Sequence, residues 1–302
     1  MTLQDFKKEV KTNHPELFIK STGRGIWMIA HAWLVMFFAI YFYSLFPNLL
    51  VGLLVVMIIG SRQLGISILM HEAAHRTLVN GKKLNNFLGS WFCSLPVVYS
   101  LQDYRHYHLE HHWNTQQTND PDLHLSKKFP VTVASMARKF VRDLFGLTGL
   151  KLRYFQLKGF IFSTKSLASK GQSLVKVIFS QFLIFSGFAL FFSYEYYFYF
   201  WILPLLTWFQ FITRVRNIAE HAMVQNDDDP LLHARHINAN IFERIFLAPY
   251  YVNYHLEHHL LMSLPCYNFK NFYQILLKKF GEENLEIKHS YFDVLKLATK
   301  TA

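Results

Sequence analysis

Four long apolar runs constrain this chain more than any other feature of its sequence. They cover residues 27–45, 49–70, 174–192 and 197–215, and polar residues flank each of them. A helix needs about 20 apolar residues to cross the hydrocarbon core of a bilayer, because each residue adds only about 1.5 Å. The whole chain is 52% hydrophobic and 17% charged, which is too apolar for an ordinary soluble domain. These runs predict an all-α integral membrane protein with four transmembrane helices.

The four runs pair into two hairpins with very short turns. The break Phe46-Pro47-Asn48 separates the first two runs, and Ser193-Tyr194-Glu195-Tyr196 separates the last two. Neither turn contains Lys or Arg, whereas the segments before, between and after the hairpins are rich in both. Because positively charged loops stay in the cytoplasm, we expect residues 71–173 and 216–302 to form one cytosolic helical cap.

The apolar stretch 84–101 differs from the four runs because Gly89, Ser94 and Pro96 interrupt it. It must begin and end on the cytoplasmic side, so we expect a re-entrant or interfacial helix rather than a fifth span. The segments 134–145 and 269–280 combine apolar residues with Lys and Arg at helical spacing. This pattern is typical of helices that lie in the headgroup layer.

The formal net charge of +11 needs a partner of opposite sign. No basic run alternates with base-stacking aromatic residues in a recognisable module, so nucleic acid is not expected. The anionic surface of the lipid bilayer and an acidic partner protein account better for the charge. Cys93 and Cys266 lie far apart in apolar segments, without the spacing of a metal or disulfide motif, and are interpreted as packing thiols.

The pentapeptide His-Leu-Glu-His-His occurs twice, at residues 108–112 and 255–259. On a helix of 3.6 residues per turn, its three histidines fall within an arc of about 100°. An arc of that width can address two adjacent metal ions. The six imidazoles belong to His108, His111, His112, His255, His258 and His259.

Two shorter pairs stand where the second and fourth apolar runs end. His71 and His75 are four residues apart, as are Asn217 and His221, so each pair shares one helix face. All four groups of side chains then reach the same predicted cytoplasmic level. Nine imidazoles exceed what one tetrahedral zinc uses, but they suit two iron ions with positions left open for oxygen.

These motifs, in this order, resemble those of the membrane fatty-acid desaturase and hydroxylase superfamily. Its pattern Hx(3–4)H, Hx(2–3)HH and (H/Q)x(2–3)HH is matched by His71-Glu-Ala-Ala-His75 and by the two pentapeptides, and Asn217-Ile-Ala-Glu-His221 resembles the additional NxxxH element of acyl desaturases. The resemblance implies two non-haem irons held by the nine histidines, with Asn217 approaching iron through water. It also implies O2 as co-substrate and a long-chain acyl lipid as substrate.

Several residues near the motifs have open roles. Four glutamates adjoin a motif histidine and either orient its ring and balance charge or lie on a solvated helix face: Glu72, Glu110, Glu220 and Glu257. Asp120-Pro-Asp122 and Asp227-Asp228-Asp229 are interpreted as caps or turns. Arg62, inside the second run, is interpreted as snorkelling or as part of a buried structural pair. The histidines outside the motifs receive no ligand role: His14, His31, His106, His124, His233, His236 and His289.

Three other functions are compatible with parts of the pattern. The same ligand set supports a hydroxylase of a fatty acid, a sphingolipid or a carotenoid, because the outcome depends on where the substrate lies. His71-Glu72-Ala-Ala-His75 also matches the HExxH motif of zinc metalloproteases, but that reading leaves at least six motif histidines unused. A transporter or a passive metal-binding protein lacks support from any inverted repeat.

The remaining expectations concern partners and location. We see no haem-binding cytochrome domain in the sequence, so we expect a separate ferredoxin, rubredoxin or cytochrome to supply electrons. The sequence ends in Leu297-Ala-Thr-Lys-Thr-Ala302, without a dilysine retention signal. We therefore expect a bacterial inner membrane, with the active site on its cytoplasmic side.

Overall fold

The computed structural model describes residues 2–162, 167–224 and 229–300. Helices dominate these residues, and the strands are two-residue segments in two parallel pairs. Strand β1 (Val131–Thr132) pairs with β4 (Thr299–Lys300), and β2 (His236–Ile237) pairs with β3 (Ile287–Lys288). The strands fasten the C-terminal segment to the rest of the cap, and the predicted all-α class is confirmed.

Four helices among the described residues are long and apolar enough to cross a membrane. They are α2 (Thr22–Leu45), α3 (Leu49–His75), the part Ser173–Phe191 of α9 (Leu167–Phe191), and the composite helix Tyr194–His221. The side chain of Asn48 caps α3 by accepting a hydrogen bond from the backbone N–H of Val51 at 3.1 Å. Helix α3 continues past the predicted end at residue 70, because nothing breaks it before Arg76 takes a left-handed backbone conformation.

The fourth predicted span is not one continuous helix. It consists of α10 (Tyr194–Tyr197), the π-helix η4 (Phe198–Ile202), α11 (Leu203–Leu206) and α12 (Trp208–His221). Pro204 has no N–H to continue an α-helical ladder, and Thr207 departs from helical geometry at φ −115° and ψ −91°. Gly60 of α3 permits the close approach of this kink, because a Cβ there would lie 2.9 Å from the Trp208 side chain.

The stretch 84–101 folds into short bent pieces, each too short to span a membrane. They are α4 (Lys82–Leu88), the π-helix η2 (Gly89–Ser94) and the 3-10 helix η3 (Leu95–Val97). Gly89 packs directly on α3, since a Cβ there would lie 2.3 Å from the Cβ of Ala73. This contact holds the bent segment against the helix that carries the first histidine pair.

Gln181 of α9 joins this segment to the fourth span. Its amide nitrogen donates to the carbonyl oxygens of Leu95 at 3.2 Å and Pro96 at 2.9 Å. Its amide oxygen accepts from the Tyr197 hydroxyl at 3.1 Å and from the Trp201 indole at 3.2 Å. A polar side chain is stable inside a span when all its hydrogen-bonding groups find partners, and this one does.

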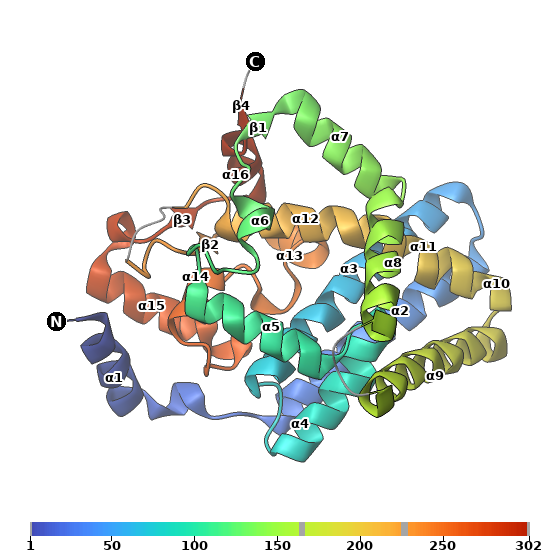
Figure 1. Ribbon diagram of the computed structural model, residues 1–302, viewed down its shortest axis with the longest axis horizontal. Coiled ribbons are helices and arrows are strands. Elements are labelled where there is room, and N and C mark those ends of the chain that lie inside the picture. Colours follow the sequence, from blue (N-terminus) through green and yellow to red (C-terminus); the bar gives the residue numbers. More distant parts are fainter. Residues whose placement is uncertain (1, 163–166, 225–228, 301–302) are drawn as a thin grey trace.

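The elements outside the four candidate spans and the stretch 84–101 are called the cap. Of these, α1 and α15 lie at the end of the molecule opposite α10 in Figure 1, whereas α8 lies beside α11. The predicted helices at 134–145 and 269–280 are present, whereas α8 was not anticipated. The α-helices of the cap are α1 (Leu3–Asn13), α5 (Leu101–Asn114), α6 (Leu123–Ser126), α7 (Val133–Leu144), α8 (Leu147–Phe162), α13 (Ile241–Phe246), α14 (His255–Leu260), α15 (Phe269–Phe280) and α16 (Tyr291–Leu297). Its 3-10 helices are η1 (Pro15–Phe18), η5 (Pro249–Tyr251), η6 (Cys266–Asn268) and η7 (Glu282–Asn284).

Arg62 has a structural partner in the cap. Its guanidinium donates to the carbonyl oxygen of Ile245 and lies 5.9 Å from the centre of the Tyr250 ring. The side chain is 8% exposed, so it is a buried structural cation and does not snorkel. Arg62 thereby docks α3 onto the segment that leads to the second pentapeptide.

Candidate metal centre

Four helices bring the nine motif histidines together in two adjacent groups. They are α3, α5, α12 and α14, and one ring nitrogen from every histidine of a group lies within 4.8 Å of those of the others. Centre 1 contains His71, His75, His108, His112 and His258. Centre 2 contains His111, His221, His255 and His259.

Each pentapeptide contributes side chains to both centres. On α5, His108 and His112 are one turn apart and face centre 1, while His111 faces centre 2. On α14 the division is reversed, because His258 faces centre 1 and His255 faces centre 2 together with His259. The two centres therefore share two helices, and neither helix can shift without disturbing both.

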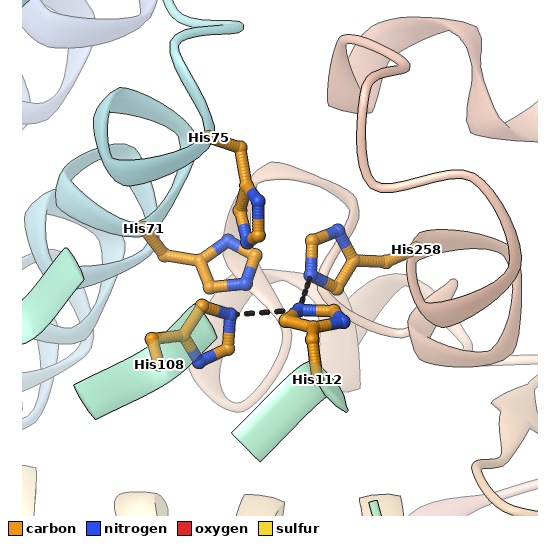
Figure 2. A group of neighbouring side chains, drawn as sticks. All are labelled: His71, His75, His108, His112 and His258. Atoms are coloured by element: carbon orange, nitrogen blue, oxygen red, sulfur yellow. Dashed lines mark hydrogen bonds between the residues drawn. The ribbon is translucent and has the colours of Figure 1, made fainter. Parts of the chain in front are cut away.

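The contacts between ring nitrogens show that a cation fits centre 1. Nε2 of His112 lies 3.0 Å from Nε2 of His108 and 2.8 Å from Nε2 of His258, as the dashed lines in Figure 2 show. A ring nitrogen carries either a proton or a lone pair, so it cannot donate to one neighbour while accepting from another. A metal ion that binds all three lone pairs removes this conflict.

Centre 2 repeats the same arrangement. Nε2 of His255 lies 2.8 Å from Nε2 of His221 and 3.0 Å from Nε2 of His259. Ligand nitrogens on opposite sides of a first-row ion lie about 4 Å apart, because each bond is about 2.0–2.1 Å long. A maximum separation of 4.8 Å within each group is therefore close to the size that one ion requires.

Burial keeps these imidazoles in the neutral form that binds metals. It lowers the pKa of His108, His112 and His258 well below the ordinary value of 6.5, and the neighbouring histidines lower it further. The pKa values of His255 and His259 fall well below that value for the same reasons. Metal ions bind deprotonated ring nitrogens, so these five residues are available as ligands at neutral pH.

Asp120 orients a histidine of centre 2. Its carboxylate lies 2.7 Å from Nδ1 of His111, which leaves Nε2 of that ring to face the centre. Burial alone would raise the pKa of the Asp120 carboxyl, but hydrogen bonds from His111 and from the backbones of Asp122 and Gln116 hold the pKa below its ordinary value. The sequence interpretation of Asp120 as a turn residue was incomplete, because the carboxylate serves the turn and the ring together.

Two more rings of centre 2 have partners at Nδ1. His221 Nδ1 lies 3.3 Å from the carbonyl oxygen of His233, and His259 Nδ1 lies 3.3 Å from the hydroxyl of Thr115. Such contacts select the tautomer and fix the plane of a ligand ring. Neither partner has a motif that sequence alone would reveal.

In centre 1, ring packing takes the place of such partners. Tyr104 stacks on His108 with ring centres 5.3 Å apart and planes at 7°. Nδ1 of His71, Nε2 of His75 and Nδ1 of His258 are buried without a hydrogen-bond partner among the described residues. A buried nitrogen without a partner is costly unless a ligand binds it. A metal ion in centre 1 would satisfy Nε2 of His75, but Nδ1 of His258 faces away from such an ion, because Nε2 of that ring is the atom near His112.

The four glutamates beside motif histidines have different environments. Glu72 accepts hydrogen bonds from the Thr77 hydroxyl at 2.8 Å and from the Cys266 backbone at 3.0 Å. Glu220 lies 2.6 Å from the guanidinium of Arg216 and 3.6 Å from Nδ1 of His255. Glu72 thereby links α3 to the segment around Cys266, and Glu220 places a carboxylate between Arg216 and His255.

Glu257 and Glu110 differ most in their burial. Glu257 is fully buried and lies 2.7 Å from Nδ1 of His236. Glu110 is exposed on the outer face of α5, which agrees with the second of the two roles left open for it, a solvated helix face. The reason is helical geometry, since residue 110 lies about 180° round the helix from the midpoint of His108 and His112.

His236 is outside both groups, but it is not an ordinary surface histidine. It is 1% exposed, its Nε2 lies 3.0 Å from the side-chain oxygen of Asn238, and its ring stacks on Tyr273 at 3.9 Å. It therefore anchors Glu257 and, through it, α14. Asn217 is half-buried on α12, one turn before His221, and its approach to a metal stays a prediction.

A cavity of about 10 Å³ adjoins both centres. It is lined by His71 and His258 of centre 1 and by His255 of centre 2, and its apolar wall includes Ile68 and Phe269. This volume is about the least that can hold one water molecule. A larger substrate could reach the histidines only if side chains of the wall moved.

Comparisons with known proteins agree with this geometry. The family model described as fatty acid desaturase matches residues 47–291, a range that includes all nine histidines. The chain is also 30% identical over 232 residues to dihydrorhizobitoxine desaturase of Bradyrhizobium elkanii, an alignment that covers 70% of this chain and 64% of that protein. The chain thus spans somewhat less than two thirds of the relative's length, but the family match covers most of this chain. We conclude that the chain belongs to the fatty acid desaturase family.

Proposed function

We propose that this protein desaturates a long-chain fatty acyl lipid, with O2 as co-substrate and two irons held by the nine histidines. The observation that best supports this function is the pair of buried histidine groups, one of five residues and one of four, that share helices α5 and α14. Soft ligands are absent from both groups, and imidazole suits iron as well as zinc. Two groups rather than one favour a two-metal centre.

The residues of the chain have separable roles in this proposal. When bound, the irons would supply the oxidising power to remove hydrogen from an unactivated C–H bond, which no side chain can supply. The imidazoles hold the metals, and Asp120 keeps the His111 ring in the tautomer that presents Nε2. Apolar residues such as Ile68 and Phe269 border the small cavity and exclude water from the reacting carbon.

The position of the centres supports a substrate from the bilayer. His71 and His75 end one candidate span, and His221 ends another. A chain that enters from the hydrocarbon core therefore meets the histidines first at the ends of these helices. The Bradyrhizobium relative is named for dihydrorhizobitoxine, so family membership alone leaves the substrate open and an unbiased assay is needed.

Lipid mass spectrometry of cells that express the protein with a matched electron donor tests the proposal. A product two hydrogens lighter than its precursor supports desaturation. A product heavier by one oxygen supports the alternative, a hydroxylase on the same scaffold. Cells that express the His258→Ala variant are the control, and no difference between the two cultures would contradict both reactions.

The environment of Glu72 argues against the protease alternative. A metalloprotease needs this carboxylate free to act as a base beside one zinc. Here Oε2 of Glu72 accepts hydrogen bonds from Thr77 and Cys266, and the histidines gather in two groups. Purified protein with about two irons per chain supports the proposal, whereas one zinc with full activity would contradict it.

We further propose that both termini and the cap lie in the cytoplasm of a bacterial inner membrane, where a separate ferredoxin, rubredoxin or cytochrome delivers electrons. The absence of Lys and Arg from the two short turns supports this orientation. Both native cysteines are buried, so single cysteines can be introduced as probes. A membrane-impermeant reagent should label Ser193→Cys from outside intact cells and should not label His14→Cys, and the reverse result would overturn the orientation.

A further inference from the structure

A large apolar chamber lies between α2 and α9, and no motif histidine lines it. Its volume is about 550 Å³, which is within the range of small-molecule binding sites. Its walls come from α2, η2, α9 and the fourth span. The chamber is therefore a feature of the membrane-spanning part and is separate from the small cavity at the two centres.

Aromatic side chains form one end and the floor of the chamber. The ring of Phe37 on α2 meets Phe191, the last residue of α9, at 6.1 Å and the following Phe192 at 5.2 Å, which forms the end near the short turns. Trp33 stacks on Trp201 at 5.5 Å and forms the floor. The indole N–H of Trp33 donates to the carbonyl oxygen of Phe92 at 3.1 Å, so this wall is fixed.

The length of the chamber fits a hydrocarbon chain. Ile26 and Ile40 both line it, and fourteen residues of α-helix rise about 21 Å. The hydrocarbon of one bilayer leaflet is about 15 Å thick. Gly187 leaves open space in the wall of the chamber, because a Cβ added there would meet no atom within 4 Å.

A positively charged side chain lies at the predicted cytoplasmic end of α9, on the helix face that lines the chamber. Ser180, Ile184, Gly187 and Phe191 line the chamber at helical spacing. Lys176 lies one turn earlier on the same face and is exposed. A lysine at the headgroup level attracts the phosphate of an anionic lipid, so charge as well as shape defines the occupant.

We propose that this chamber binds one acyl chain of an anionic phospholipid, whose phosphate lies against Lys176. The site is distinct from the reaction centre and does not depend on the proposed activity. Bound there, the lipid fills the gap between the first hairpin and α9.

Native mass spectrometry of the detergent-purified protein tests the site, with phosphatidylglycerol as the probe. The wild type should retain one phosphatidylglycerol per chain. Gly187→Phe fills the chamber and should reduce the bound fraction at least tenfold. Leu190→Phe is the matched control, because Leu190 is on the same helix but 77% exposed, and it should bind as the wild type does.

Further variants test the binding of the acyl chain and the binding of the headgroup separately. Ala30→Phe fills the chamber from the opposite wall and should act as Gly187→Phe does, which keeps the test valid if one variant misfolds. Lys176→Gln should abolish the preference for phosphatidylglycerol over phosphatidylcholine while a lipid still binds. Equal phospholipid retention by the wild type and both filled variants would overturn the proposal, as would a bound free fatty acid in place of the phospholipid.

Discussion

Centre 1 and centre 2 have the same kind of ligands but different supports. Three rings of centre 2 have a polar partner at Nδ1, and the strongest contact is 2.7 Å between His111 and Asp120. In centre 1 the nearest comparable carboxylate, Glu72, lies 3.7 Å from Nδ1 of His71. Centre 1 is held instead by the packing of its rings against one another and against Tyr104.

The two centres therefore illustrate two ways of fixing the orientation of an imidazole ring. A hydrogen bond fixes the tautomer and the plane of one ring, so its loss affects one ligand. Packing in a close-fitting interior fixes several rings together, so a change propagates to neighbours. We therefore expect single polar substitutions to distinguish the centres, whereas loss of any ligand should disable both.

The largest expected effect comes from removing one ligand from each centre. His258→Ala in centre 1 and His111→Ala in centre 2 should each abolish product formation, and the double variant should be no worse than either, as for groups that act as one unit. Product yield and iron per chain are the measurements. A single variant with normal iron content and substantial turnover would show that the centres work independently.

Asp120→Asn should weaken metal binding at centre 2 alone. Loss of a carboxylate that orients a ligand histidine typically costs about 10–100-fold in metal affinity. Metal titration should therefore show one weakened site and one unchanged site. Glu110→Gln on the exposed face of α5 is the control and should match the wild type. If Asp120→Asn weakened both sites equally, the two centres would not be supported separately.

His236→Ala should weaken both centres to the same extent, because Glu257 lies on α14 between His255 and His258. Removing the ring leaves a buried carboxylate oxygen without its partner, at a cost of about 1–3 kcal/mol or more in the free energy of unfolding. Thermal unfolding and metal content are the measurements. His14→Ala serves as the control because His14 is not buried and lies outside both centres. Unchanged thermal stability of His236→Ala would argue against this anchoring role.

Glu72→Gln should have the smallest effect of the four. The amide oxygen of glutamine can still accept hydrogen bonds from Thr77 and from the Cys266 backbone, and Nδ1 of His71 lies 3.7 Å from the Glu72 carboxylate, too far for a hydrogen bond. Turnover should fall by only a few fold, less than after Asp120→Asn. Complete loss of turnover at normal iron content would mean that Glu72 acts directly as an acid or base.

The predicted spans lie close to four helices that are long and apolar enough to cross a membrane, because a long apolar run has few alternatives in a bilayer. The exceptions have local causes. Thr207 and Pro204 break the fourth span, and the end of α3 extends to His75 because the first histidine pair continues its helix. The motif histidines were found by spacing, since a period of 3.6 residues places ligands on one helix face.

The sequence by itself determined the apolar spans and the donor set, because bilayer thickness and helical periodicity act on residues near one another in the chain. Only the tertiary structure decided how the ligands divide, since His258 of α14 joins His71 of α3 across nearly two hundred residues. It also revealed the contacts of His236 with Glu257 and of His111 with Asp120. Those depend on how separate helices pack, and a contact between distant segments leaves no periodic pattern in one sequence.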